Sequence, residues 1–329
     1  MSTKKIGDVI LDVKNISLRF GGVKALTDIS FNVKEHEIRS IIGPNGAGKS
    51  SMLNCINGVY TPSEGSITFR GKTFDHMNSR QVAEMGIGRS FQNLALFKGM
   101  SVIDNIMTGR NLKIKSNLLL QALRIGPAER EEIRHREYVE HIIDFLEIDH
   151  IRHAPVSALS YGLQKRVEMA RALAMKPEIL MLDEPVAGMS REETEDMARF
   201  ILDVRAEWGV TVLMVEHDMG MVMDLSDHVV VLNFGQVIAQ GVPAVVQADP
   251  EVNRAYLGSG NVHELRAKLQ AAAHPATALT TAATAAATER ADKLEAALAE
   301  RLQHIAERFP RAVLASSLAV EDMIITDQI

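Results

Sequence analysis

Alternating apolar and polar residues mark the N-terminal part of the chain. The alternation covers residues 10–33, is interrupted by the pair Gly21 and Gly22, and returns at residues 66–70 after a turn. A period of two is typical of strands that bury one face and expose the other. We therefore predict two or three antiparallel strands within residues 10–33 and a further strand at 66–70.

Short, largely apolar runs mark a second kind of strand, which is buried on both faces. The runs cover residues 38–42, 179–182 and 210–215, and a final hairpin covers 229–232 and 236–240. Stretches of helical periodicity separate them, such as 165–176 and 191–208. Strands that alternate with helices are typical of an α/β fold. We predict a mixed sheet at the core of the chain, with the antiparallel strands as a β subdomain.

A third region has the period of helices. Apolar residues recur at intervals of three and four between residues 128 and 147, and residues 100–107 and 112–124 also have a helical pattern. We predict that about residues 93–175 form a helical subdomain set into the α/β core. One face of the helix at 128–147 either packs on its own core or meets another protein.

The composition narrows the classes of function. The 329 residues carry a formal net charge of −6, which argues against broad nucleic-acid binding. Cys55 is the only cysteine, so we expect no disulfide framework and no thiolate metal site. We find no signal-peptide pattern and no run of the ~18 apolar residues that a membrane helix requires. We therefore expect a cytosolic protein that meets a membrane only through a partner or a surface.

One stretch fits G-x-x-x-x-G-K-[ST], the pattern of a phosphate-binding loop. It follows the predicted strand at 38–42 and precedes a predicted helix at 51–57. Its residues are Gly43, Pro44, Asn45, Gly46, Ala47, Gly48, Lys49 and Ser50. The glycines allow backbone N–H groups to surround phosphate oxygens, and the helix N-terminus adds positive potential. We predict nucleotide binding, with Lys49 at the β- and γ-phosphates and the Ser50 hydroxyl on Mg²⁺.

Two carboxylates follow the apolar run at 179–182. A chain with a phosphate loop needs one acidic group for the metal ion and one for the attacking water. We predict that Asp183 holds Mg²⁺ through water. Glu184 would orient or deprotonate the attacking water.

Weaker signals occur at five other positions. Phe20 ends a strand upstream of the phosphate loop, and it either stacks on adenine or faces the core. Gln92 is either a neutral ligand or water-positioning group, or a solvated side chain. His217 ends the strand at 210–215 and either contacts a γ-phosphate or is structural. Ser160 is a good N-cap residue, and together with Gly162 it can hold an anion at a helix N-terminus.

Taken together, these segments resemble the ATP-binding subunit of ATP-binding cassette (ABC) transporters over residues 10–258. Five motifs stand in the family's order: the phosphate loop at 43–50, the glutamine loop at Gln92, the signature at 159–164, the acidic motif that ends at Glu184, and the switch histidine His217. Within the family the chain looks most like the subunit that serves branched-chain amino acid uptake. The cues for this subgroup are residues 89–92, 159–162 and 255–258 and the helical insert near 110–150.

The resemblance implies an ATPase that uses ATP and Mg²⁺ and works as a pair of cassettes, either two copies or two related chains. The implied catalytic residues are Glu184, His217 and Gln92, and the implied Mg²⁺ ligands are Ser50, Gln92 and Asp183. ATP would contact Phe20, residues 43–50 and Ser51 of one cassette and Ser160 and Gly162 of the other. The implied partners are integral-membrane permease subunits at the cytoplasmic face of the inner membrane and, indirectly, a periplasmic solute-binding protein.

Two segments depart from the family's pattern. Tyr161 and Leu163 stand in the signature where the wider family has Gly and often Gly or Gln, but Ser160 and Gly162 are kept. We therefore still expect a working composite site. Ser190 stands where the family often has an aspartate, which leaves open how the two cassettes communicate at that position.

The composition changes after Gly258, where we place the end of the cassette domain (residues 1–258). Residues 259–288 are rich in Ala and Thr, which predicts a linker or a weakly formed helix. Residues 289–329 resemble the opening of phosphoadenylyl-sulfate and adenylyl-sulfate reductases, but the sequence lacks the reactive cysteine and most of that fold's sheet. The tail is therefore either an inactive remnant of a fusion or of a gene end, or a regulatory or dimer-contact extension.

Other functions stay open at this point. A soluble cassette protein of translation or DNA repair would usually carry two cassettes or long coiled-coil or zinc insertions, which the sequence does not show. The cysteine count argues against a sulfur-assimilation reductase. Because the ATP-binding subunit does not contact the transported solute, urea, short amides and aromatic acids are candidate solutes beside branched-chain amino acids.

Overall fold

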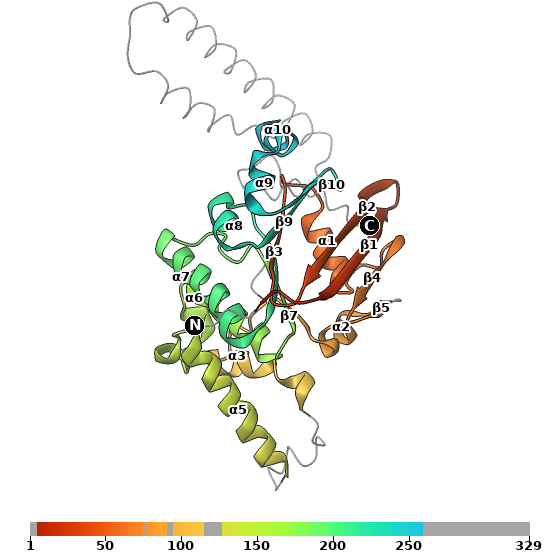
Figure 1. Ribbon diagram of the computed structural model, residues 1–329. Helices are drawn as coiled ribbons and strands as arrows, with labels where there is room; N and C mark the ends of the chain where they lie inside the picture. The colour runs from red at the N-terminus through yellow and green to blue at the C-terminus, as the bar shows by residue number, and fades with distance from the viewer. Residues whose placement is uncertain (1–4, 75–76, 91–94, 115–126, 259–329) are drawn as a thin grey trace, which may run out of the picture. The chain divides into compact units, whose positions relative to one another are not determined.

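The computed structural model describes residues 5–74, 77–90, 95–114 and 127–258. Within these ranges the chain forms a four-stranded and a six-stranded β-sheet with helices between and beside them (Figure 1). None of the helices in these ranges has the length and apolarity that a membrane span needs. The predicted α/β architecture with a separate antiparallel sheet is therefore confirmed.

The four-stranded sheet is antiparallel and has the order β2-β1-β4-β5. Its strands are β1 (Val9–Phe20), β2 (Val23–Lys34), β4 (Glu64–Phe69) and β5 (Lys72–Phe74). One face of β1 and β2 is buried, as the alternating pattern requires. The predicted strand at 66–70 ends one residue earlier because Arg70 adopts a left-handed conformation, with φ of 49°, at the turn into β5.

The six-stranded sheet has the order β10-β9-β3-β8-β7-β6 and is parallel except for β10. Its strands are β3 (Ile38–Ile42), β6 (Ile87–Arg89), β7 (Ile179–Asp183), β8 (Thr211–Val215), β9 (His228–Asn233) and β10 (Gln236–Gly241). In a parallel sheet the carboxyl ends of neighbouring strands meet at one edge, where ligands bind. The segments that follow β3, β6, β7 and β8 therefore gather at that edge.

Two hydrophobic clusters lie on the two faces of this sheet. Helix α1 (Lys49–Ile56) packs between the two sheets, together with alternate residues of the central strands such as Ile41 and Met181. The other face, with Ile42 and Leu182, is covered by further helices. These are α3 (Val102–Thr108), α5 (Pro127–Phe145), α6 (Tyr161–Ala174), α7 (Arg191–Asp203) and α8 (Met219–Leu225).

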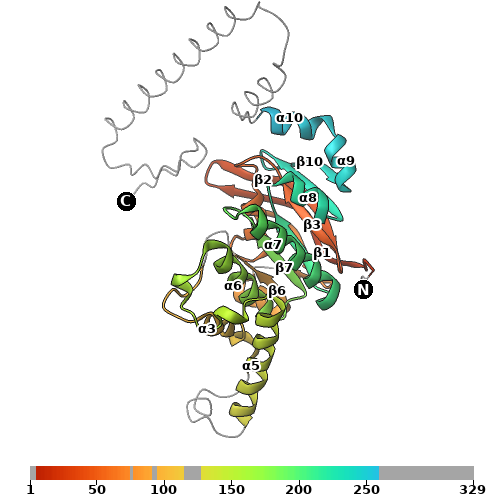
Figure 2. The same cartoon turned by 90° about the vertical axis from the view of Figure 1, so that its left-hand side faces the viewer.

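The remaining helices lie at the margins of the sheets. Helix α2 (Ser79–Met85) leads into β6, and α9 (Pro243–Ala248) and α10 (Pro250–Gly258) follow β10. Both views show α5 extending away from the sheets (Figures 1 and 2). The helix predicted at 128–147 is α5, whereas most of the one predicted at 112–124 lies outside the described residues.

Three helix predictions differ from the structure. The helix predicted at 165–176 begins earlier, at Tyr161, because Ser160 caps it. The helix predicted over 191–208 ends at Asp203 and continues as a π-helix (Val204–Trp208), in which Trp208 stacks on His141 of α5 at 5.7 Å between ring centroids. The short helices α8 and α9 were not predicted. The first outcome follows from a local cap, whereas the end of α7 depends on packing against α5, which local periodicity does not report.

Candidate functional site

The phosphate loop connects β3 to α1 at the carboxyl edge of the six-stranded sheet. Gly43, Gly46 and Gly48 all have positive φ angles, so the loop takes a path that other residues would resist. The Lys49 ammonium lies inside the loop and donates hydrogen bonds to the carbonyl oxygens of Gly43 at 2.8 Å and Pro44 at 3.0 Å. The loop is therefore closed around its own lysine.

Carboxylates surround the Lys49 side chain. Burial lowers the pKa of this lysine from its ordinary value, while the charges of Glu184, Asp183 and Glu216 act in the opposite direction. The three acids come from β7 and from the segments that follow β7 and β8. The fold therefore places the predicted lysine and the predicted acidic pair in one site.

Asp183 ends β7 and is 2% exposed. Its Oδ2 accepts a hydrogen bond from Arg89 at 2.8 Å, and Arg89 also donates to Oδ1 of Asn54 in α1 at 2.6 Å. The other oxygen, Oδ1 of Asp183, is buried without a hydrogen-bond partner in the described part of the chain. A buried anionic oxygen of this kind fits a cation.

Glu184 follows in a strained backbone conformation. Its φ is 49°, a region that few residues other than glycine adopt and that often occurs at functional sites. Two hydrogen bonds hold the residue there: its N–H donates to the Val215 carbonyl at 2.9 Å, and its carbonyl accepts from the Lys165 ammonium at 3.4 Å. The Glu184 carboxylate lies 3.8 Å from Nδ1 of His217. The second acid and the histidine therefore face each other.

Glu216 is fully buried and connects the loops that follow β7 and β8. Its carboxylate accepts backbone N–H groups from Val186 at 3.2 Å, His217 at 3.0 Å and Asp218 at 3.4 Å. Burial raises the pKa of Glu216, and these N–H donors oppose the rise. The sequence analysis gave no role to Glu216 or to Arg89. The one available signal was that Glu216 directly follows the predicted strand at 210–215, whereas no strand was predicted at Arg89.

Three predicted ligand positions lie around the loop. Ser50 and Ser51 are half-buried in the first turn of α1. Phe20 is 48% exposed at the end of β1 and packs edge-on against Tyr60 at 5.1 Å. Phe20 is thus not a core residue, and its contact with adenine stays a prediction. Gln92 lies outside the described residues.

The predicted signature residues lie on a different face of the sheet. Ser160 is exposed and caps α6, with its Oγ accepting the Leu163 N–H at 3.4 Å. Gly162 is buried, and a Cβ at this position would collide with the Glu193 carboxylate. Helix α6 packs in one hydrophobic cluster and α1 in the other. Helix α6 thus packs on the opposite face of the six-stranded sheet from α1, and contact of Ser160 and Gly162 with a nucleotide stays a prediction.

Ser190 caps α7 in a reciprocal capping box. Its Oγ accepts the Glu193 N–H at 3.3 Å, and the Glu193 carboxylate accepts the Ser190 N–H at 3.0 Å. Serine and aspartate are both strong N-cap residues. The departure from the family's pattern at this position therefore preserves the start of α7.

Comparison with known proteins decides the family. Residues 26–187 match the model of the family described as "ABC transporter". The chain is 38% identical over 249 residues to the high-affinity branched-chain amino acid transport ATP-binding protein BraF of Pseudomonas aeruginosa, which covers 76% of this chain and 98% of that protein. The chain belongs to the ATP-binding subunits of ABC transporters. It is thus a nucleotide-binding ATPase of the family that drives transport.

Further matches concern the subgroup and the fold of this ABC ATPase. Residues 236–261 match the model described as "Branched-chain amino acid ATP-binding cassette transporter". The ADP conformation of MJ1267, an ATP-binding cassette of an ABC transporter, superposes with a TM-score of 0.66 at 32% identity and covers 76% of this chain and 99% of MJ1267. The dimeric, post-hydrolysis cassette MJ0796 bound to ADP and Pi gives 0.61 at 25% identity over 71% of this chain and 98% of MJ0796.

The tail stands apart from this family assignment. The reductase resemblance of residues 289–329 lies outside the described residues, and these matches give it no support. The domain boundaries at 258 and 288 stay predictions. The same holds for the limits of the helical subdomain at about 93–175.

Proposed function

We propose that this chain is the ATP-hydrolysing motor subunit of an importer for branched-chain or related amino acids. The observation that carries the proposal is the meeting of Lys49, Asp183 and Glu184 at one sheet edge, in a chain that matches BraF over 76% of its own length and 98% of BraF. The cargo class rests on that similarity and on the subgroup match at residues 236–261. The motor itself does not touch the cargo.

Nucleotide phosphates would enter the loop at Lys49. The loop's N–H groups and the α1 N-terminus would surround the phosphate oxygens, and Phe20 would stack on adenine. Mg²⁺ would be held by Ser50, by Asp183 and by Gln92, and it would neutralise charge on the β- and γ-phosphates. The partnerless oxygen of Asp183 supports this assignment. In the described residues no three His, Cys, Asp or Glu side chains cluster as a metal site, so the phosphates would supply the remaining ligands.

Hydrolysis would start at Glu184. Its carboxylate would take the proton of the attacking water, and His217 would contact the γ-phosphate from the adjacent loop. The strained backbone of Glu184, fixed at both ends, supports a role that needs one direction of the side chain.

A second cassette would complete the site. Because α6 and α1 lie on different faces of the sheet, Ser160 and Gly162 would serve the nucleotide of the partner. The dimeric form of MJ0796 with ADP and Pi supports such a pair. Opening of the pair after hydrolysis would act on permease subunits through the region of Gln92 and the helical subdomain. The chain would then work at the cytoplasmic face of the inner membrane, with a periplasmic solute-binding protein delivering the cargo.

The first experiment replaces the proposed base. Glu184→Gln keeps the shape of the side chain but removes its proton acceptor, so we expect ATP binding near that of the parent. Turnover should fall by about 10²-fold or more, the usual contribution of a general base. Binding is measured by calorimetry and turnover by phosphate release.

A matched control makes the same Glu-to-Gln change at a different position. Glu195 is exposed on α7 and pairs with Arg191 at 3.1 Å, so Glu195→Gln should leave both readouts unchanged. Turnover by Glu184→Gln near the parent rate would show that the role assigned to Glu184 is wrong.

A further inference from the structure

The turn between β9 and β10 is hydrogen-bonded to the phosphate loop. The Gly235 N–H donates to the carbonyl oxygen of Ala47 at 3.0 Å, and the Gly235 carbonyl accepts the Thr27 N–H at 2.8 Å. Ala47 belongs to the loop and Thr27 to β2. One residue therefore connects the phosphate loop to the strand that follows Phe20.

The contact at Gly235 leaves no room for a side chain. Its φ is 73°, and a Cβ there would lie 2.5 Å from the Ala25 carbonyl oxygen. A Cβ at Gly48 would lie 2.7 Å from Leu26 Cδ2 and 3.6 Å from the Gly235 Cα. A Cβ at Gly43 would collide with the Leu232 carbonyl oxygen. The backbones of the loop, β2 and the β9–β10 turn thus pack too closely to admit a side chain at these three glycines.

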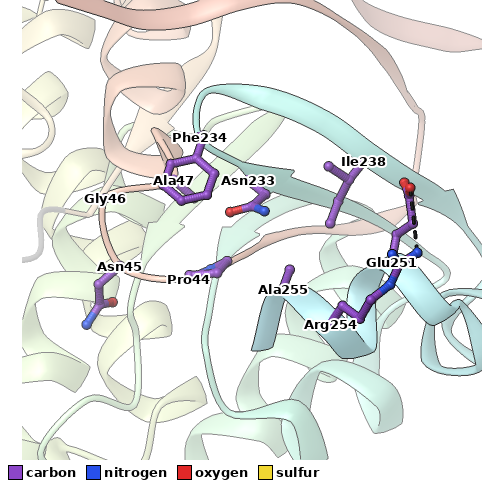
Figure 3. A pocket seen from close by; sticks show the side chains of 10 residues that line it. All are labelled: Pro44, Asn45, Gly46, Ala47, Asn233, Phe234, Ile238, Glu251, Arg254 and Ala255. Carbon is purple, nitrogen blue, oxygen red and sulfur yellow. Dashed lines mark ion pairs between the residues drawn. The ribbon is translucent and has the colours of Figure 1, made fainter. Parts of the chain in front are cut away.

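The outer side of the loop borders an open cavity of about 460 Å³. Figure 3 shows this cavity between the loop at Pro44 to Ala47, the hairpin that carries Phe234, and the residues Glu251, Arg254 and Ala255 of α10. Phe234 is 89% exposed, so its ring does not wedge the loop in place. Gly235 is therefore the residue through which the hairpin hydrogen-bonds to the loop at Ala47.

We propose that Gly235 is a positioning residue for ATP: it holds the Ala47 carbonyl and so sets the direction of the loop's phosphate-binding N–H groups. The inference rests on the proposed nucleotide site. A peptide carbonyl and the next N–H belong to one rigid plane. Holding the Ala47 oxygen therefore also fixes the N–H of Gly48, directly before Lys49.

The test is Gly235→Ala with Gly71→Ala as the matched control in the full chain. Gly71 has the same φ of 73° but nothing within 4 Å of its Cβ position. Both variants carry the backbone strain, but only in Gly235→Ala does the added Cβ meet backbone, that of Ala25 and Leu26 in β2, so that the turn holding Ala47 has to shift. We expect Gly235→Ala to raise the Kd for ADP and the KM for ATP by about tenfold or more, while kcat stays within about threefold, the pattern of lost uniform binding.

A merely structural role would give a different result. It would lower the melting temperature more in Gly235→Ala, where the added Cβ also meets the Ala25 carbonyl, than in Gly71→Ala, and it would leave the Kd for ADP within about twofold of the parent. That result for a folded Gly235→Ala would overturn the inference. A parent chain that bound no ADP would overturn the nucleotide site itself, and the inference with it.

A second measurement needs no variant. Hydrogen exchange of the parent chain with and without ADP compares the turn at residues 232–236 with the turn at 70–72. We expect ADP to slow exchange in the first turn and leave the second unchanged. Equal behaviour of the two turns would overturn the inference even if Gly235→Ala does not fold.

Discussion

At the scale of single residues, Arg89 donates a hydrogen bond to Oδ2 of Asp183 and leaves Oδ1 without a partner in the described part of the chain. The pair is 2.8 Å apart, with both side chains at most 5% exposed. A buried ion pair of this kind contributes little net stability, because desolvation offsets the attraction, but removing one partner leaves a buried charge. Arg89 therefore acts mainly by pairing with the Asp183 carboxylate, and it adds little net stability to the fold.

The first prediction follows from this pair. Arg89→Met should reduce the free energy of unfolding by about 3–5 kcal/mol, the cost of leaving a buried charge without its partner. Arg80→Met is the control, because Arg80 pairs with Glu84 on an exposed face of α2, where such pairs contribute at most about 1 kcal/mol. Urea unfolding measures both. Equal losses in the two variants would contradict the assignment.

The same scale shows which site residues the sequence can predict. Residues 43–50 and the pair Asp183 and Glu184 stand in contiguous motifs, so their chemistry is visible from spacing alone. Arg89 and Glu216 act across strands that are far apart in sequence, and the order β3-β8-β7-β6 brings them to the site. Sheet order cannot be read from local periodicity, so their roles could not be predicted.

At the scale of elements, several of the predicted site residues lie at the N-termini of helices. Ser160 caps α6, Ser190 caps α7 and Gly48 precedes α1 with a φ of 99°. The longer strands and helices were predictable because each has a clear period or an apolar run, whereas the three-residue strands β5 and β6 were not predicted. The π-helix at the end of α7 and the short helices α8 and α9 were not, because packing around Trp208 and the turns after β8 and β10 decide them.

The cap of α6 gives the second prediction. Ser160→Ala should cost about 1 kcal/mol of stability, the usual effect of losing an N-cap, and should also abolish ATP-driven dimer formation in the Glu184→Gln background. Ser101→Ala is the control, since Ser101 caps α3 by accepting the Asp104 N–H at 3.2 Å. Light scattering with ATP reports the dimer. A dimer that persists in Ser160→Ala would contradict the composite site.

At the scale of the whole molecule, two hydrophobic clusters share the six-stranded sheet. One joins this sheet to α1 and the antiparallel strands, and the other joins it to the remaining helices. Arg70 links the antiparallel sheet to the segments before β3 and β7 by ion pairs to Glu35 and Glu178. The phosphate loop lies where α1 begins, between the two sheets, so that both clusters fix its surroundings.

The third prediction concerns the extent of this core. A chain cut after Gly258 should keep ATP turnover within about twofold and its melting temperature, since in the described part of the chain the residues of both hydrophobic clusters all precede this cut. A chain cut after Asp249 also loses α10, with the buried Val252 and the Tyr256 hydroxyl, whose pKa burial raises to about 12. This shorter chain should be much less stable. Lost turnover in the longer chain would instead favour a regulatory tail.

The lysine enclosed by its own loop has a consequence for the catalytic cycle. Its ammonium gives up hydration when the polypeptide folds, and two peptide carbonyls replace the lost water. At the proposed nucleotide site, an arriving triphosphate would then exchange one set of oxygen acceptors for another. The free-energy cost of removing water from the Lys49 ammonium would therefore arise during folding and not in each round of hydrolysis.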